Sequence, residues 1–554
     1  MIQKLKKLFT KENSLGGATV LLMFTLVCSN ILGLFRNRFL AQKLTQESLD
    51  IYLSAFRIPD LIFNLLILGA ITIAFIPILS KYVVKKDLKS AWHITSSVLN
   101  FALLALIFLL LTAFFLMPYI MPKIVPGFDP ARLAQAIFLS RLMLLSPFFF
   151  GLSYIFSGVA NAFKRYFAYS VAPLFYNLSI ILAVLLFADK LGVLAPTIGV
   201  LAGAFLHMVI QVPPLLSLGF CWKPVLDFKN ADFTLMLRLA GPRILTLLSI
   251  QAIWIAFNIL ASLKPGSITY LNFANDIQTF FSVVFASSFA IALFPFLSES
   301  QAKKDKEQFE KFLEKGVQQI LYFILFSSVV LVLLRVEIIR VILGTGYFGW
   351  KATIITANTM AVFAIGLVGA SLIQLLARAF YSLHDAKTPA IVSVVSAGLS
   401  IGLGWFLVRW LFAQNYYSFW AKSDLITESL AFAFAVGSII NWILLWIFLR
   451  KKYQILPVSS FWADFIKLAL SALGAGAVIQ LTKMLVGELV NMQAFWGVFV
   501  KLVVSLGVGA FAYWLTARFL KCDYSDELIL VFKRKIGLVK DESCLLYTSP
   551  SPRD

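Results

Sequence analysis

A pair of opposite charges lies near the start of a long apolar segment. Residues 51–87 have the sequence IYLSAFRIPDLIFNLLILGAITIAFIPILSKYVVKKD, in which Arg57 and Asp60 lie on either side of Pro59. Ionisable side chains inside a membrane usually face a bundle interior or a watery cavity, where they mark a substrate path. Residues three apart also share a helix face, so Arg57 and Asp60 can instead neutralise each other beside a proline kink. Both interpretations stay open at this point.

Further arginines lie in or at the ends of other apolar segments. They are Arg36, Arg38, Arg141 and Arg243, and fewer acids accompany them. Arg38 and Arg141 have a simpler explanation, because a long side chain at a helix end can extend to the membrane surface. As a set the arginines still predict an electropositive cavity within the membrane.

The elements that must position these residues are transmembrane helices. The chain of 554 residues is 60% hydrophobic, with a mean hydropathy of +0.88, which is far more apolar than a soluble protein needs. Apolar windows of about 20 residues, the length that crosses roughly 30 Å of hydrocarbon, recur about 14 times. The expected spans lie near 15–35, 50–80, 91–119, 133–162, 167–188, 195–219, 233–262, 268–298, 313–336, 352–381, 387–411, 426–449, 460–482 and 493–519.

Charge in the connections predicts the orientation. Lysine and arginine are concentrated in the N-terminal stretch and in the loops after even-numbered spans, and short positively charged loops stay cytoplasmic. Both termini are therefore expected inside. The net charge of +21 is explained by this bias and by attraction to anionic lipid, and not by nucleic-acid binding.

Several function classes lack their usual residues. The four cysteines lie within the first span or on predicted cytoplasmic segments, where disulfides rarely persist, and the three histidines are too scattered for a zinc site. The sequence contains no DxD motif and no Walker phosphate loop, and acids are few within its apolar segments, which disfavours a metal-dependent enzyme and an ATP-driven pump. We expect no cofactor and no enzymatic activity. The last dozen residues, 543–554, are predicted to be a disordered tail or a non-native extension.

The sequence repeats itself with an offset of 218 residues. Pro77 corresponds to Pro295, and the triplet KKD at 85–87 recurs at 303–305. A similar offset relates ANAF at 160–163 to ARAF at 377–380. Each copy holds six predicted spans, so both copies enter the membrane in the same direction, as in transporters built from parallel repeats. A substrate would then bind between the two bundles.

Six stretches resemble one known family in order and spacing. They are NILGLFRNRFLA, LDIYLSAFRIPDLIFNLLILGAITIAFIPILSKY, VPGFD, ANAFKRYFAYSVAPLFYNLSII, AGPRILTLLSIQ and ARAFYSLHDAKTP. The family is MurJ (MviN), the lipid II flippases of the multidrug, oligosaccharidyl-lipid and polysaccharide exporter superfamily. The resemblance covers residues 15–450, and the last two spans agree in position and number only.

The resemblance implies a fold and a cargo. The fold is an all-α integral membrane protein of the bacterial inner membrane, with two six-helix lobes in a V shape and two added helices that form a groove for a polyprenyl tail. The cargo is lipid II, the undecaprenyl-pyrophosphate precursor of peptidoglycan, moved from the cytoplasmic to the outer leaflet. The expected organisation is a basic N-terminus (1–14), a first lobe (15–222), a second lobe (223–452), the added helices (453–520) and a cytoplasmic tail (521–554).

The resemblance also assigns residues. Arg36 matches a cavity arginine, Asp50 the acidic residue that starts the second helix, Arg57 a basic position before the proline, and Gln251 a polar position further on. The expected substrate-binding set is Arg36, Asp50, Arg57, Asp60, Arg141, Arg243 and Gln251. Well-characterised members carry cations where this chain has Asn30, Phe63 and Asp276. Either another arginine takes over the anion contact, or the cargo differs from standard lipid II.

Two rivals share the scaffold. One exports another polyprenyl-linked saccharide, and the other is an antiporter for drug-like cations, which should show uncompensated carboxylates in the first lobe. The expected partners are lipid II or a related lipid and the membrane itself, for a monomer. An inside-negative potential favours outward movement of an anion by about 2.3 kcal/mol per charge at 100 mV, and a cation gradient is the alternative driving force.

Overall fold

Every regular element in the part of the chain that the structure describes is a helix. The computed structural model describes residues 15–413, 425–455 and 461–522, and no strand occurs among them. The expected N-terminal stretch and C-terminal tail lie outside these residues, apart from the tail's first two positions. The predicted all-α class is confirmed.

The first half of the chain contributes eleven helical segments, several of which join into longer spans. They are α2 (Leu15–Lys43), α3 (Gln46–Ala55), α4 (Arg57–Phe63), the π-helix η1 (Asn64–Ile71), α5 (Thr72–Val84), α6 (Leu88–Ile124), α7 (Pro130–Met143), α8 (Leu145–Ala162), α9 (Phe167–Leu191), α10 (Leu194–Val209) and α11 (Val212–Ser217).

The second half repeats this arrangement and adds a helix pair. Its helices are α12 (Ala231–Ala261), α13 (Ser267–Phe281), the π-helix η2 (Ser282–Ser287), α14 (Ser288–Ala302), α15 (Lys306–Leu333), α16 (Arg335–Ile342), α17 (Trp350–Ser382), α18 (Lys387–Ala413) and α19 (Leu425–Tyr453), followed by α20 (Phe461–Leu489) and α21 (Phe495–Phe519).

Twelve helical spans in the described residues are long and apolar enough to cross a membrane. They account for twelve of the expected fourteen. The other two expected spans correspond to α2 and to the run α3–α5, which are not among the twelve. The chain is a multi-pass membrane protein, and the count of fourteen stays a prediction.

The second expected span is interrupted where the sequence carries Pro59. Proline cannot donate to the carbonyl oxygen four residues earlier, and that residue, Ala55, is where α3 ends. The span then passes through η1, and π-helices are rare and often occur at functional sites. The other π-helix, η2, begins at Ser282, which is 218 residues after Asn64. Both copies therefore break the same helix at the same place.

Local backbone geometry repeats with the same offset. Lys86 and Lys304 both have left-handed backbone conformations, with φ of 57° and 56°. The next residues, Asp87 and Asp305, each accept a hydrogen bond from the first turn of the following helix, α6 and α15. The internal repeat that the sequence indicates is thus present in the backbone, while the lobe boundaries stay predictions.

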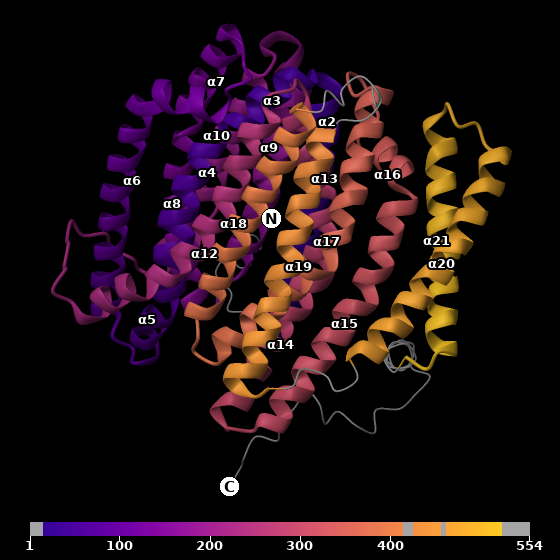
Figure 1. Ribbon diagram of the computed structural model, residues 1–554. Coiled ribbons are helices and arrows are strands. Elements are labelled where there is room, and N and C mark those ends of the chain that lie inside the picture. Colours follow the sequence, from indigo (N-terminus) through magenta and orange to yellow (C-terminus); the bar gives the residue numbers. More distant parts are fainter. Residues whose placement is uncertain (1–14, 414–424, 456–460, 523–554) are drawn as a thin grey trace, which may run out of the picture.

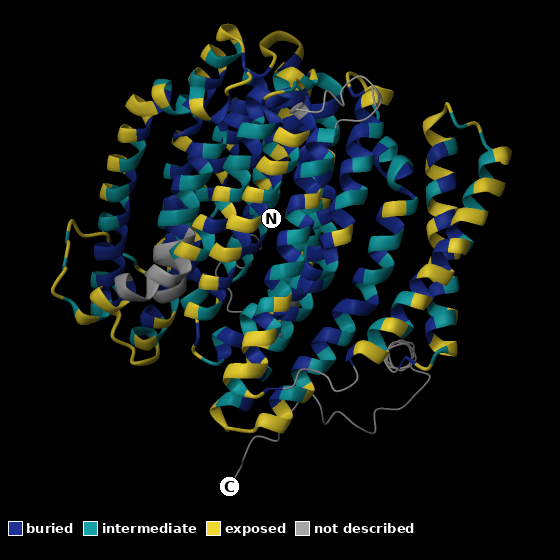
Figure 2. Ribbon diagram, in the orientation of Figure 1, coloured by how far each residue is buried: buried dark blue, intermediate teal, exposed yellow. Residues whose placement is uncertain are grey.

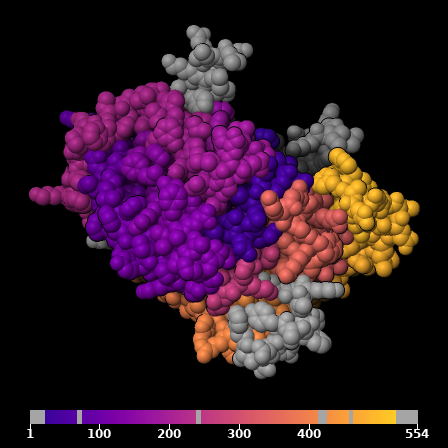
Figure 3. Space-filling model, turned by 90° about the horizontal axis from the view of Figure 1, so that it is seen from above, coloured from indigo at the N-terminus to yellow at the C-terminus, as the bar shows by residue number. Residues whose placement is uncertain are grey.

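The two halves lie side by side with the added pair at one edge. In Figure 1 the indigo and purple helices of the first half lie to the left and most of the salmon and orange helices of the second half to the right. The pair α20–α21 packs on α15 and α16 and lies at the rim in the view from above (Figure 3). Figure 2 shows buried residues concentrated near the upper ends, where α3 meets α13.

Candidate functional site

Arg36 of α2 binds polar side chains from three helices. Its Nη1 donates to Oδ1 of Asn177 in α9 at 3.2 Å, and its Nε and Nη2 donate to Oδ1 of Asn37 at 3.2 and 3.1 Å. Nη2 also lies 3.8 Å from Oδ2 of Asp276 in α13. Asn37 donates to the same oxygen of Asp276 at 2.8 Å. Arg36 therefore links the first half of the chain to the second.

Arg57 makes its contacts with the second half as well. Its Nε donates to Oδ1 of Asn258 in α12 at 3.1 Å, and its Nη2 donates to Oδ1 of Asn272 in α13 at 2.8 Å. The guanidinium carbon lies 5.7 Å from the ring centre of Trp254, close enough for a cation–π contact. Its hydrogen-bond partners are thus amides of the second half, while Asp60 is an electrostatic neighbour.

Four ionisable side chains, Arg36, Arg57, Asp60 and Asp276, lie together between the two halves, and we call them the interface cluster. Their charges are balanced. Asp276 interacts electrostatically with both arginines, and Asp60 with Arg57. Two cations thus face two carboxylates, so the expected electropositive excess is not present in these four residues. The side chains of Arg36 and Asp276 are 24% and 41% exposed.

The other expected binding residues have separate places. Gln251 is partly buried on the face of α12 that also carries Trp254 and Asn258, so it lies in line with the contacts of Arg57. Arg141 lies elsewhere, because its Nε donates to the carbonyl oxygen of Phe114 in α6 at 3.0 Å and its guanidinium stacks on that ring. The side chain of Arg243 lies outside the described residues.

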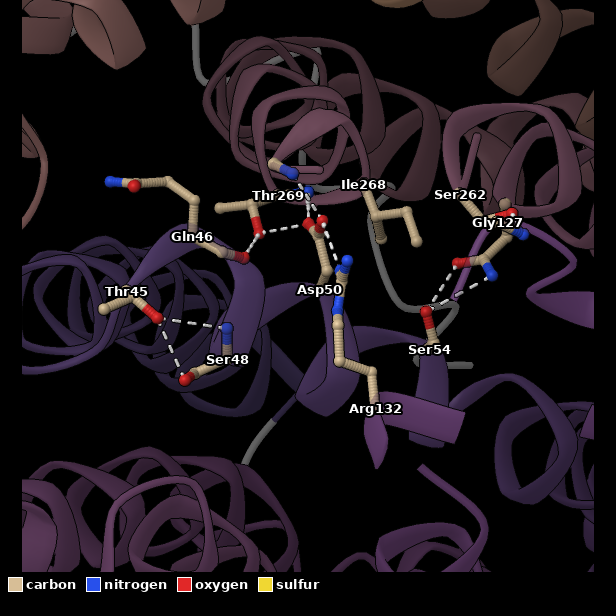
Figure 4. A network of polar contacts seen from close by, with 12 residues as sticks. Thr45, Gln46, Ser48, Asp50, Ser54, Gly127, Arg132, Ser262, Ile268 and Thr269 are labelled. Atoms are coloured by element: carbon tan, nitrogen blue, oxygen red, sulfur yellow. Dashed lines mark hydrogen bonds and ion pairs between the residues drawn. The ribbon is translucent and has the colours of Figure 1, made fainter. Parts of the chain in front are cut away.

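Asp50 lies in a second interface network, shown in Figure 4. Its carboxylate accepts hydrogen bonds from the backbone nitrogen of Gly266 at 2.5 Å and from the nitrogen and hydroxyl of Thr269 at 2.9 and 2.7 Å. Arg132 of α7 lies 3.6 Å away as an ion-pair partner. Asp50 is completely buried and caps the N-terminus of α13, where a negative charge is favourable.

The backbones of the two halves approach each other closely at the same end. A Cβ atom at Gly127 would lie 2.1 Å from the carbonyl oxygen of Ser262, and one at Gly346 would lie 2.0 Å from that of Gln42. Only glycine fits such contacts. Gln46 also donates to the carbonyl oxygen of Tyr347 at 2.7 Å. We call this end, with the Asp50 network, the outer closure, after the orientation that the lysine-rich loops predict.

The resemblance to MurJ extends over most of the chain. The family model of the lipid II flippase MurJ matches residues 22–500. This chain belongs to the MurJ family. A probable lipid II flippase MurJ of Buchnera aphidicola is 25% identical over 515 residues, which cover 90% of this chain and 96% of the relative. A lipid II flippase MurJ of Burkholderia cenocepacia is 26% identical over 81% of this chain and 86% of its own.

Solved structures agree on the fold. A lipid II flippase MurJ in an inward closed conformation matches with a TM-score of 0.73 and 23% identity, over 93% of this chain and 99% of that one. An inward-facing multidrug transporter of the MATE family matches with a TM-score of 0.64 and 12% identity, over 79% and 98%. These similarities show the shared scaffold of MurJ and MATE proteins.

The three departures from the family pattern lie in different surroundings. Asn30 donates to the carbonyl oxygen of Leu26 within its own helix at 2.8 Å. Phe63 packs against Phe150 and Tyr154, with ring centres 5.5 and 5.2 Å apart. Only Asp276 contacts Arg36. In this MurJ chain a carboxylate therefore occupies a cluster position where the resemblance led us to expect a cation.

An apolar cavity of about 700 Å³ lies beside the added helix pair. Residues of α15, α17, α19 and α20 line it, and the few polar groups include Ser328 and Gln480. Its walls thus come both from the second half and from the first of the added helices. This is the part of the chain where the resemblance to MurJ places the lipid-tail groove.

Sequence reasoning missed the amides that hold the arginines. These amides carry no charge and fit several roles, so the sequence does not indicate that they belong to the site. They are Asn37, Asn258 and Asn272. Asn258 did have a signal, because it is a single amide within the apolar stretch IWIAFNIL. A buried amide needs partners, and here its oxygen accepts from Arg57 while its nitrogen donates to the hydroxyl of Ser54 and to the carbonyl oxygen of Ile124.

Proposed function

We propose that this chain moves lipid II from the cytoplasmic to the outer leaflet by alternating access. The observation that carries the proposal is that Arg36 and Arg57, both from the first half, bind polar groups of the second half. A cargo that contacts these arginines therefore acts on the interface between the halves. Membership of the MurJ family and the names of its relatives support lipid II as that cargo.

The chemistry of lipid II suits two separate parts of the structure. Its pyrophosphate is a multiply charged anion, and planar guanidinium groups bind phosphate oxygens with paired hydrogen bonds. Its polyprenyl tail is a long hydrocarbon, which suits the apolar cavity between α15, α17, α19 and α20. We assign the headgroup to the interface cluster and the tail to this cavity.

The proposed orientation places both termini and the lysine-rich loops in the cytoplasm of a bacterial cell. The outer closure then faces the cell exterior, and the described conformation is one that blocks release. An inside-negative potential would favour outward movement of the anionic headgroup, by about 2.3 kcal/mol per charge at 100 mV. We further propose that the protein works as a monomer without a cofactor.

Leaflet-specific labelling of lipid II tests the proposal directly. In cells depleted of this protein, lipid II should accumulate in the cytoplasmic leaflet, and expression of the chain should restore exposure to an external lipid II-cleaving probe. Proteoliposomes with purified protein should do the same without ATP. A parallel measurement with an undecaprenyl-phosphate-linked saccharide tests the rival cargo. Transport of that lipid but not of lipid II would contradict the proposal and favour another polyprenyl-linked saccharide.

A further inference from the structure

The carboxylate of Asp276 lies beside Arg36 at the interface of the two halves. The ion pair joins Nη2 and Oδ2 at 3.8 Å, while Asn37 holds the same oxygen at 2.8 Å. The other donors of Arg36 bind the amides of Asn37 and Asn177, which fix the guanidinium without neutralising it. Asp276 is therefore the partner that compensates the charge of Arg36.

We propose that Asp276 occupies Arg36 in the empty protein and that an anionic pyrophosphate displaces it. The cargo would thereby break a contact between α2 and α13, and its own binding would loosen the interface. This inference rests on the proposed function, because it takes the polyprenyl pyrophosphate as the ligand of that site. It assigns to Asp276 a role in selecting the cargo.

The geometry makes Asp276 easier to displace than the amides. Its ion pair is longer than a direct hydrogen bond, and its side chain is 41% exposed, so the carboxylate has room to turn away from Arg36. A pyrophosphate offers more charge and two oxygens to one guanidinium, and these charge-assisted contacts are stronger. Arg36 meanwhile stays in place through Asn177.

Competition of this kind also discriminates between cargoes. A neutral molecule gains too little from Arg36 to replace a carboxylate, and a cation would favour the paired state by binding Asp276 itself. Only an anion both binds Arg36 and repels the released Asp276. Asp276 therefore adds selectivity by disfavouring neutral and cationic molecules, while Arg36 attracts the anion.

The displaced residue belongs to the helix that the outer closure holds. Asp276 lies nine residues after Ser267, the first residue of α13, which is about 14 Å along the helix at 1.5 Å per residue. Asp50 binds the backbone of that same N-terminus through Gly266 and Thr269. Repulsion between the pyrophosphate and Asp276 would therefore act on the helix that keeps the exterior side closed.

Binding of purified lipid II to the full chain tests the first step. Asp276→Asn keeps the shape and retains an acceptor for Asn37, so we expect it to fold and to bind lipid II about tenfold more tightly. Asp189→Asn is the matched control, because Asp189 is 72% exposed and pairs with Lys43 outside the cluster. Its affinity should equal that of the wild type. Equal or weaker binding by Asp276→Asn would overturn the displacement.

Distances across the outer closure test the second step. Spin labels at Glu47 and Tyr347 should separate when lipid II is added to the wild type, whereas Asp276→Asn, which has no carboxylate to be repelled, should bind lipid II without this separation. Undecaprenol, which lacks phosphate, should leave the wild type unchanged. Separation by undecaprenol would overturn the anion requirement. A wild type that binds no polyprenyl pyrophosphate would overturn the proposed function together with this inference.

Discussion

Asp50 in the first half caps the helix that begins beside Thr269 in the second half. Its carboxylate accepts bonds from both the backbone nitrogen and the hydroxyl of Thr269, and Arg132 faces it at 3.6 Å. Nε and Nη2 of Arg132 are buried without a hydrogen bond, so that side chain depends on the charge of Asp50. The resemblance led us to expect Asp50 in the substrate site, whereas its contacts suit a role in holding the two halves together at the outer closure.

We predict that Asp50→Asn opens the outer closure. The amide would turn one N–H₂ group toward the backbone donors of α13 and leave Arg132 without a counter-charge, which costs about 3–5 kcal/mol for a buried pair. Ser267 is completely buried, so a cysteine there reports on opening. It should resist a membrane-impermeant thiol reagent in the wild type and react in Asp50→Asn. If the cysteine is unreactive in both proteins, Asp50 is not needed to keep the outer closure closed.

A second prediction concerns orientation. Cysteines at Lys85 and Lys306, beside the two left-handed lysines, should be protected from an external thiol reagent in intact cells. Cysteines at Pro126 and Tyr347, at the opposite end of the helices, should react. These positions avoid the strained backbone of Lys86 and Lys304. The reverse pattern would place the outer closure in the cytoplasm and contradict the proposed direction of transport.

The sequence allowed the helices and the repeat to be predicted because both depend on local signals. Apolar length indicates spans, and the offset of 218 residues relates Pro77 to Pro295 and η1 to η2. The arginines of the interface were also visible, because charges are rare inside apolar segments. All these features are properties of a single stretch of chain or of its copy.

The partners of those arginines were not predictable in the same way. Helical spacing allowed a pair between Arg57 and Asp60, but it could not indicate that Asn258 and Asn272 reach Arg57 from about 200 residues away. Asp276 stands where the resemblance implies a cation, and its contact with Arg36 depends on how α2 and α13 meet. Such contacts follow from the packing of the halves, which no local pattern contains.

Glu337 provides a third prediction, on the attachment of the added helices. It lies in α16 between Lys483 of α20 at 3.2 Å and Lys501 of α21 at 3.3 Å, and it is 5% exposed. Glu337→Gln would leave two poorly solvated lysines without a counter-charge, so we expect a loss of about 3–5 kcal/mol in the free energy of unfolding. Combining it with Lys501→Met should restore part of the loss.

Glu307→Gln is the control for this experiment. Glu307 forms an ion pair with Lys311 at 3.8 Å, but both side chains are largely exposed, and such pairs contribute little. Thermal melts of the purified variants should therefore show a lower transition temperature for Glu337→Gln only. Equal transition temperatures for both variants would mean that apolar packing alone holds α20 and α21.

A fourth prediction concerns acid stability at the loop before α18. Partial burial disfavours the ionised form of Asp385, but hydrogen bonds from Lys452, Thr388 and Tyr453 outweigh this effect and hold its pKa well below the ordinary value. A lowered folded-state pKa stabilises the protein above the unfolded value, near 4, and this stability is lost as the pH falls through the folded-state pKa.

Asp385→Asn should therefore melt at a lower temperature than the wild type at pH 7, and the difference should shrink as the pH falls below about 4. Glu299→Gln, which removes an exposed partner of Lys303, should show no such trend. If the difference in melting temperature does not change with pH, the effect of Asp385→Asn comes from altered packing or hydrogen bonding and not from the lost charge.

The last prediction distinguishes a binding role of Arg57 from a structural one. Its two hydrogen bonds reach neutral amides, so Arg57→Ala removes a cation without leaving a direct ion-pair partner alone. We expect Arg57→Ala to abolish complementation of a flippase-depleted strain with a small change in melting temperature. Arg57→Lys should recover part of the activity, because an ammonium keeps the charge but cannot serve Asn258 and Asn272 in the same fork. If Arg57 instead served to neutralise Asp60, the alanine variant would melt early and adding Asp60→Asn would restore its stability. The present contacts predict no such rescue, because Asp60 is an electrostatic neighbour of Arg57 and not its hydrogen-bond partner.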